Sequence, residues 1–117
     1  MKPPGKAPSQ IRVTRGDVWL AVLDPTVGSE IQKSRPCVII SPPEMHDYLR
    51  VVIAAPMTTG SRPAPWRIPI KFGVKDGLIL LDQIRTLDKQ RLIRRLGAVD
   101  TPTFDALLDR LQDVFAK

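Results

Sequence analysis

The sequence predicts a small β-barrel with one helix packed against its side, and three features of the chain support this prediction. Its 117 residues suit a single domain with one hydrophobic core. Roughly five to seven short segments rich in Val, Ile and aromatic residues alternate with turn signals, which is typical of small barrels. The last segment instead repeats its apolar residues at the spacing of an amphipathic helix.

Three strands are expected in the first half of the chain. The segment GDVWLAVL, residues 16–23, follows a Gly-Asp turn signal and ends at Asp24-Pro25. A polar loop then runs from Pro25 to Arg35. The next two strands are the apolar runs CVIIS, from Cys37, and VVIAAP, from Val51, which the segment PPEMHDYLR separates. Their excess of Val and Ile indicates strands that are buried on both faces.

The second half begins with a loop, MTTGSRPAP, and continues with WRIPI, residues 66–70. This strand belongs at an edge of the sheet, because Pro69 has no N–H to donate to a neighbouring strand. A turn is expected at Lys75-Asp76-Gly77. The segment LILLDQIRTL, residues 78–87, is then expected to form one strand.

The end of the chain is predicted to be helical. One helical turn from Asp88 and a strand from about Ile93 to Val99 are expected to precede the helix. Thr101 is expected to cap this helix, with Pro102 in the first helical position. Its apolar residues recur on one face, which is expected to cover the barrel: Phe104, Leu107, Leu108, Leu111, Val114 and Phe115.

The net charge of +6 is concentrated in two stretches that contain no acidic residue. Residues 1–15 contain Lys2, Lys6, Arg12 and Arg15, and residues 61–75 contain Arg62, Arg67, Lys71 and Lys75. Such stretches suit a phosphate backbone or an acidic protein segment, although basic residues also simply solvate a surface. Residues 1–14, which are basic and rich in proline, are expected to be a flexible leader before a domain at 15–117.

The residue inventory argues against several classes of function. His46 is the only histidine and Cys37 the only cysteine, so one chain cannot assemble the usual zinc ligands, a pair of catalytic histidines or an internal disulfide. Cys37 is expected to be a small buried hydrophobe. No glycine motif for nucleotides is present, so no cofactor is expected. A secretory signal and the ~20 apolar residues of a membrane helix are also absent, which predicts a cytoplasmic location.

Polar residues at strand ends form the candidate site. Arg35 precedes one apolar run, and Thr58 and Thr59 follow another. If these ends meet, a guanidinium and two hydroxyls form an arrangement that binds phosphate. Gln83 and Arg85 are able to line the same surface. Each residue also has an ordinary alternative: an ion pair for Arg35, turn hydroxyls for the threonines, and the outward face of a strand for the other two.

Such a site is suited to cleaving RNA without a metal ion. The 2′-hydroxyl attacks the adjacent phosphorus, so the protein has only to remove a proton, stabilise charge on the phosphoryl oxygens and protonate the leaving 5′-oxygen. Arg35 suits the second task but not that of a base, because guanidinium groups stay protonated. Glu30 is the nearest carboxylate, unless it is only a solvated loop residue, and His46 is an acid or base by residue type. The residues alone leave the base open.

Four segments of the chain, in this order, resemble one family. They are RGDVWLAVLDPTVGSE, KSRPCVIIS, APMTTG and LDQIRTLDKQRLIRRLG. Together they are similar to the MazF/PemK-type toxins, the ribosome-independent endoribonucleases of bacterial type II toxin-antitoxin pairs. The resemblance covers residues 15–117, which is nearly everything except the leader.

The resemblance implies an SH3-like barrel, a homodimer, and sequence-specific, metal-independent cleavage of single-stranded mRNA with 2′,3′-cyclic phosphate and 5′-hydroxyl ends. It implies catalytic roles for Arg35, in the RP motif, and Thr58, the first of the TT pair. Glu30, in GSE, would act in catalysis or contact the substrate. RNA contacts fall on Ser29, Lys33, Thr59, Gln83 and Arg85. A cognate MazE-like antitoxin, through its acidic, extended tail, would block the RNA groove.

Two other functions remain possible for this sequence. One is a nucleic-acid-binding SH3-like module without catalysis, and the other is a toxin of the same fold that poisons DNA gyrase. In the endoribonuclease interpretation, the loop from Gly28 to Ser34 faces the substrate. Pro36 then holds the backbone of Arg35 extended where this loop ends.

Overall fold

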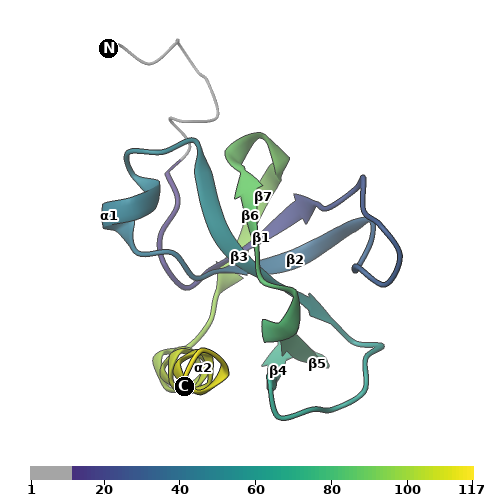
Figure 1. The fold of residues 1–117 in the computed structure, drawn as a ribbon. Helices are drawn as coiled ribbons and strands as arrows, with labels where there is room; N and C mark the ends of the chain where they lie inside the picture. Colours follow the sequence, from purple (N-terminus) through teal and green to yellow (C-terminus); the bar gives the residue numbers. More distant parts are fainter. Residues whose placement is uncertain (1–11) are drawn as a thin grey trace.

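The structure is a computed structural model that describes residues 12–117, and Figure 1 shows its fold. Residues 1–11, most of the expected leader, lie outside the described part. The described part is mainly β with a C-terminal helix, as predicted. Its elements are β1 (Asp17–Val22), β2 (Ser34–Ile39), α1 (Pro43–His46), β3 (Val51–Thr58), β4 (Arg67–Phe72), β5 (Lys75–Leu80), the 3₁₀ turn η2 (Leu81–Gln83), β6 (Arg85–Asp88), the 3₁₀ turn η3 (Lys89–Arg91), β7 (Leu92–Ala98) and α2 (Thr101–Val114).

Strand β3 lies at the centre of the antiparallel sheet and changes partners along its length. The strand order is β4-β5-β3-β2-β1-β7, and β6 also pairs with β3. The first half of β3 pairs with β6, residues 54–56 pair with β2, and Met57 and Thr58 pair with β5. The end of β3, where Thr58 lies, is therefore the place where β2 and β5 come together.

The sheet curls into a half-barrel and buries both of its faces. One core contains Trp19, Ile39 and Val52, and the other contains Val38 together with Leu107 of α2. Neighbouring residues of β2 thus point into opposite cores, as the alternation of a strand requires. In Figure 1, α2 lies below the curled sheet, beside the hairpin of β4 and β5. The prediction of strands that are buried on both faces is confirmed.

Most of the predicted strands are confirmed, but one prediction is wrong. The segment 78–87 is not a single strand, because the turn η2 divides it into β5 and β6. Both parts pair with β3 at different positions, so the break lets the chain follow β3 as the sheet curls. Strand β4 lies at the end of the sheet, which agrees with the edge position predicted from Pro69. The helical turn and strand expected after Asp88 are present as η3 and β7.

Three local predictions require correction. The residues Lys75–Gly77 begin β5 and do not form a turn, because the chain reverses earlier, at Gly73, whose φ of 62° suits glycine. The cap of α2 is Asp100 and not Thr101, since the carboxylate of Asp100 accepts a hydrogen bond from the N–H of Thr103 at 3.4 Å. The segment PPEMHDYLR, which was expected only to connect two strands, contains the one-turn helix α1.

Helix α2 packs against the sheet along most of its predicted apolar face. Leu107 is fully buried in the second core, and Phe104, Leu108 and Leu111 pack against that core. The guanidinium of Arg15 lies 5.5 Å from the centre of the Phe104 ring, which joins the start of the domain to the helix. The last two apolar residues of the face, Val114 and Phe115, are exposed.

Cys37 is fully buried in the first core, as expected. Burial raises the pKa of its thiol to about 12, and the positive charge of Arg85 offsets this only in part. Because the thiolate is the reactive form, the side chain is chemically inert at neutral pH. Cys37 therefore contributes to the packing of the first hydrophobic core.

Within residues 12–117, no helix is both long and apolar enough to cross a membrane.

Candidate active site

The pairing of β2 with β3 brings Arg35 to the end of β3. In this ladder Cys37 lies opposite Pro56. Arg35 precedes Cys37 by two residues and Thr58 follows Pro56 by two residues, so both lie just beyond the same end of this ladder. The two strand ends that carry these residues therefore meet.

Arg35 and Thr58 line the same surface pocket, of about 250 Å³, which we call the Arg35 pocket. Strands β2 and β3 and the hairpin of β4 and β5 all contribute to it. Arg35 and Lys75 supply its positive charge, and no acidic residue lines it. The remaining lining residues are Ser34, Pro36, Met57, Thr59, Ile70, Phe72 and Gly77. The pocket therefore favours an anion.

The guanidinium of Arg35 keeps most of its donors free for a ligand. Its Nε donates to the carbonyl oxygen of Gln32 at 3.1 Å, which fixes the side chain in the loop that precedes β2. Among the described residues, no carboxylate forms an ion pair with Arg35. The ordinary alternative, an ion pair at a strand edge, is thus wrong. The terminal nitrogens form the fork that binds two oxygens of a phosphate.

The hydroxyl of Thr58 is oriented by the turn that follows β3. Its Oγ1 accepts a hydrogen bond from the N–H of Gly60 at 3.2 Å. This contact occupies a lone pair and leaves the hydroxyl hydrogen available to a ligand. Thr59 lines the same pocket and is exposed. Both threonines therefore line the same pocket as Arg35.

Four of the other predicted residues, Ser29 among them, line a second pocket. Glu30, Gln83 and Arg85 lie in this pocket, which does not include Arg35 or Thr58. The carboxylate of Glu30 accepts a hydrogen bond from the N–H of Val27 at 2.6 Å, within its own turn. The structure thus brings together two groups of predicted residues, but it separates Glu30 from the Arg35 pocket.

Gln83 and Arg85 also hold the loop between β1 and β2. The Oε1 of Gln83 accepts a hydrogen bond from the N–H of Ile31 at 2.7 Å, and Arg85 donates to the carbonyl oxygen of Leu23 at 3.1 Å. In the same loop, the N–H of Lys33 donates to the carboxylate of Asp24 at 3.1 Å. Lys33 lines neither pocket. These contacts fix the loop beside the pockets.

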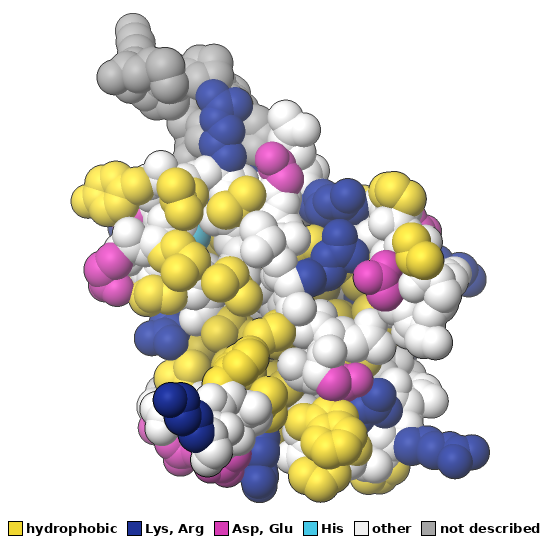
Figure 2. Space-filling view, viewed as in Figure 1, with side chains coloured by type: hydrophobic (Ala, Val, Ile, Leu, Met, Phe, Trp, Pro, Cys, Tyr) yellow, Lys and Arg dark blue, Asp and Glu magenta, His cyan; other side chains and the backbone are white. Residues whose placement is uncertain are grey.

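The basic stretch at residues 61–75 is only partly available to a ligand. The guanidinium of Arg67 forms an ion pair with Asp82 at 3.1 Å, and this hydrogen-bonded contact raises the pKa of Arg67. Lys75, in contrast, lines the Arg35 pocket. Figure 2 shows further basic side chains, in dark blue, beside the loop that joins β1 and β2. The positive surface therefore extends past the pocket.

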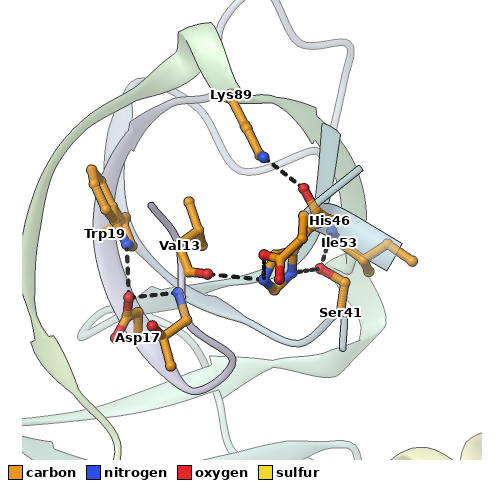
Figure 3. Close-up of polar contacts among 9 residues, drawn as sticks. Val13, Asp17, Trp19, Ser41, His46, Ile53 and Lys89 are labelled. Atoms are coloured by element: carbon orange, nitrogen blue, oxygen red, sulfur yellow. Dashed lines mark hydrogen bonds and ion pairs between the residues drawn. The ribbon is translucent and has the colours of Figure 1, made fainter. Parts of the chain in front are cut away.

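His46 lies in a buried cluster, which Figure 3 shows, and lines neither pocket. Its Nδ1 is 2.9 Å from the hydroxyl of Ser41, and its Nε2 is 2.9 Å from the carbonyl oxygen of Val13. The ammonium of Lys89 donates to the carbonyl oxygen of His46 at 2.6 Å. Because the ring is fully buried, the alternative of His46 as an acid or base is not supported.

Analysis of the sequence missed Lys75 and Gly77 as members of the pocket. Both were assigned to a turn, although they lie in β5. A glycine inside a strand often marks a close approach of another backbone, and this signal was available. A Cβ atom at Gly77 would lie 2.8 Å from the carbonyl oxygen of Thr58, which is closer than van der Waals contact allows. The absence of a side chain at Gly77 thus lets β5 approach the backbone of Thr58 closely.

Replacing Gly77 with alanine is expected to displace Thr58 and to slow RNA cleavage. The clash involves backbone, so one strand has to move by several tenths of an ångström, and misplaced groups lose efficiency steeply. We expect kcat to fall about tenfold or more, with KM much less affected. The measurement is steady-state cleavage at a temperature where circular dichroism shows the variant to be folded.

Gly60→Ala is the matched control for this prediction. Its added Cβ would lie 3.9 Å from Oγ1 of Thr58, an ordinary contact, so kcat should change little. Equal kcat values for Gly77→Ala and the parent protein would show that Gly77 does not position Thr58.

Within residues 12–117, no three His, Cys, Asp or Glu side chains lie close enough together to hold a metal ion. The Arg35 pocket itself supplies cations and hydroxyls. A guanidinium, an ammonium and hydroxyls around an acid-free pocket are the groups that bind phosphate oxygens.

A curled antiparallel sheet with a cationic, acid-free pocket where β2, β3 and β5 meet defines the class: a small β-barrel protein with a C-terminal helix. Residues 14–115 match the family of PemK-like, MazF-like toxins of type II toxin-antitoxin systems. The chain belongs to this family, which confirms the resemblance of its four segments.

Curated relatives agree with this family. Endoribonuclease MazF of Staphylococcus epidermidis is 46% identical over 90 residues, which are 72% of this chain and 75% of that protein. Endoribonuclease EndoA of Bacillus subtilis is 37% identical over 106 residues, covering 86% of this chain and 91% of the relative. Endoribonuclease PemK of Escherichia coli is 34% identical over 106 residues, covering 86% and 80%. All three names agree with the predicted class of enzyme.

Solved structures support the fold. MazF of Deinococcus radiodurans superimposes with a TM-score of 0.77 at 23% identity, over 92% of this chain and 98% of that one. An endoribonuclease in complex with its cognate antitoxin, from a mycobacterial species, gives a TM-score of 0.72 at 23% identity, over 87% and 93%. The predicted barrel with a C-terminal helix is therefore confirmed as the fold of these proteins.

Proposed function

We propose that this protein is a sequence-specific, ribosome-independent endoribonuclease toxin that cleaves single-stranded mRNA without a metal ion. The observation that carries the proposal is the meeting of Arg35 and Thr58 in one pocket without acidic residues. The family of the chain, and the names of its relatives, support RNA as the substrate.

In the proposed reaction, the 2′-hydroxyl of a nucleotide attacks the phosphorus that follows it. The 2′-oxygen to phosphorus bond forms as the bond to the leaving 5′-oxygen breaks. The 2′-hydroxyl loses its proton, and the 5′-oxygen gains one. The products are a 2′,3′-cyclic phosphate and a 5′-hydroxyl. Because the nucleophile belongs to the substrate, the chemistry requires only proton transfer and stabilisation of the phosphoryl oxygens.

The pocket residues divide these tasks. The terminal nitrogens of Arg35 bind two phosphoryl oxygens as negative charge grows on them. Thr58 donates its hydroxyl hydrogen to the phosphate while Gly60 holds its Oγ1 in place. Lys75 adds a second positive charge to the same pocket. This preorganised set of donors stabilises the transition state more than the ground state.

The second pocket extends the proposed substrate path away from the reacting phosphate. Glu30 lies there with Ser29, Gln83 and Arg85, so we assign it to substrate contact and not to proton transfer. Arg85 supplies the positive charge of this pocket. Thr59 in the Arg35 pocket, and Lys33 in the loop between the two pockets, complete the proposed RNA contacts.

The proposed partners follow from the same charge pattern. We assign to this protein a homodimer, in the cytoplasm, and a cognate MazE-like antitoxin whose acidic, extended tail competes with RNA. Two observations support the antitoxin: the cationic pocket, and the structural similarity to a mycobacterial endoribonuclease in complex with its cognate antitoxin. An acidic segment complements the field of such a surface.

The test is cleavage of a long RNA in excess chelator, followed by mapping of the product ends. We expect cuts at one short motif, with cyclic phosphate at one end and 5′-hydroxyl at the other. Thr58→Ala should lower kcat about 10- to 100-fold, because one donor to the phosphate is lost. Thr58→Ser, which keeps the hydroxyl, should retain most of the activity.

Three results would contradict the proposal. Cleavage that requires magnesium would overturn the metal-free mechanism. Binding of single-stranded RNA without any cleavage would indicate the non-catalytic module. Growth arrest with intact mRNA and damaged DNA would indicate a gyrase poison.

A further inference from the structure

We propose that the apolar half of the Arg35 pocket holds one unpaired base of the substrate, while Arg35 and Thr58 hold the phosphate beside it. This inference rests on the proposed function and adds a base subsite to it. Besides its cations, the pocket is lined by three apolar residues, Met57, Ile70 and Phe72. We call these three residues the apolar wall.

The apolar wall is firmly supported from behind. Met57 and Ile70 belong to the second hydrophobic core and are only 6% and 9% exposed. Phe72 is half-buried and packs against the same core. Because these side chains are held by the core, the wall keeps its shape without a ligand. A rigid apolar surface suits a flat, rigid ligand such as a nucleobase.

The ring of Phe72 is also held by strand β7. A Cβ atom at Gly97 would lie 3.1 Å from Cζ of Phe72, so the ring rests directly on the backbone at this glycine. Since Phe72 also lines the pocket, one part of the ring is packed and another is open to a ligand. Bases of single-stranded RNA stack on such aromatic side chains.

The charges of the two pockets favour a nucleotide in the Arg35 pocket. Its wall lies beside Arg35 and Lys75, and no carboxylate lines it, whereas Glu30 and Asp82 line the second pocket. A nucleotide joins an apolar, planar base to an anionic phosphate, and the pocket offers matching surfaces to both. The 250 Å³ volume is small for a ligand site, which suits a single base more than a longer segment.

The inference is tested with an oligonucleotide that spans the cleavage motif and carries a 2′-deoxyribose at the cleavage site. Each base is removed in turn, and binding to the parent protein is measured by fluorescence anisotropy. We expect one abasic position to weaken binding about 10- to 100-fold. In Phe72→Ala the same abasic change should have little further effect, because the stacking surface is already absent.

Two variants keep this test decisive. Phe72→Leu preserves apolar volume without the ring, so it should reduce the abasic effect even if Phe72→Ala does not fold. Tyr48→Ala removes an aromatic ring that is 86% exposed and lies outside both pockets, and it should bind each oligonucleotide as the parent protein does.

An abasic effect of equal size in the parent protein and in the Phe72 variants would overturn the base subsite, while RNA cleavage by the parent would leave the proposed function intact. If the variants bind oligonucleotides normally but lose binding of an acidic peptide, the wall belongs to a protein partner and the inference is wrong. If the parent protein neither cleaves nor binds RNA, both the subsite and the proposed function fail.

Discussion

Replacing Arg35 with alanine is expected to lower kcat for RNA cleavage about 10²- to 10³-fold, with little change in stability. The guanidinium supplies the bidentate donors of the Arg35 pocket, and within residues 12–117 its one hydrogen bond runs from Nε to the carbonyl oxygen of Gln32. Loss of that exposed bond should change the free energy of unfolding by about 1 kcal/mol or less. Cleavage kinetics and urea denaturation measure the two effects.

Two further variants separate charge from geometry in this prediction. Arg35→Lys keeps the positive charge but loses the planar fork, so its activity should lie between those of the parent protein and Arg35→Ala. Arg110→Ala removes one positive charge from the exposed face of α2, where Arg110 contacts Asp113, and should leave kcat unchanged. Undiminished cleavage by Arg35→Ala would remove Arg35 from the mechanism.

His46→Ala is expected to lower the free energy of unfolding by about 2–4 kcal/mol. The ring joins three segments of the chain: Ser41 follows β2, Val13 precedes β1, and His46 itself ends α1. Removing it leaves a cavity and two buried polar groups without this partner, and each unpaired group costs stability. Urea denaturation followed by tryptophan fluorescence measures the loss.

The hydrogen bonds of this cluster involve both ring nitrogens of His46. The carbonyl oxygen of Val13 only accepts, so Nε2 of His46 carries a hydrogen and donates to it. The hydroxyl of Ser41 accepts from the N–H of Ile53 at 3.1 Å and is free to donate to Nδ1. Both nitrogens of the ring therefore have a hydrogen-bond partner inside the fold. Such a ring stabilises the fold and lies away from both pockets.

A stability effect without a catalytic effect is therefore the expected signature of His46. Cleavage per folded molecule, measured at low temperature, should be equal for His46→Ala and the parent protein. Tyr48→Ala, two residues away and 86% exposed, should leave the free energy of unfolding within about 0.5 kcal/mol of the parent value. A large loss of cleavage with unchanged stability would restore His46 as a catalytic candidate.

The ammonium of Lys89 adds a pH dependence to the same cluster. The side chain is only 2% exposed, and burial lowers its pKa, although the charge of Asp47 acts in the opposite direction. Between the lowered pKa and the ordinary value of 10.5, the unfolded chain binds more protons at this site than the folded protein does. This group alone therefore makes stability rise with pH across that window.

Much of the fold follows from local patterns in the sequence. Runs such as CVIIS predict buried strands because alternate side chains enter the two cores, and Val38 and Ile39 do so. Pro69 predicts an edge strand because it lacks an N–H, and β4 lies at an edge. The residues at which helices and strands begin and end are less predictable from the sequence. Capping by Asp100 in place of Thr101, and the division of residues 78–87 by η2, depend on contacts that a linear pattern does not specify.

The sequence by itself determined a mainly β chain with a C-terminal helix and, through four ordered segments, its resemblance to one toxin family. Only the tertiary structure decided which polar residues share a pocket, because strand register is set by pairing between distant residues. It brought Thr58 and Arg35 into one pocket, moved Glu30 to a second pocket, buried His46 and added Lys75 and Gly77. Pairing of β3 with both β2 and β5 is the physical reason that these residues meet.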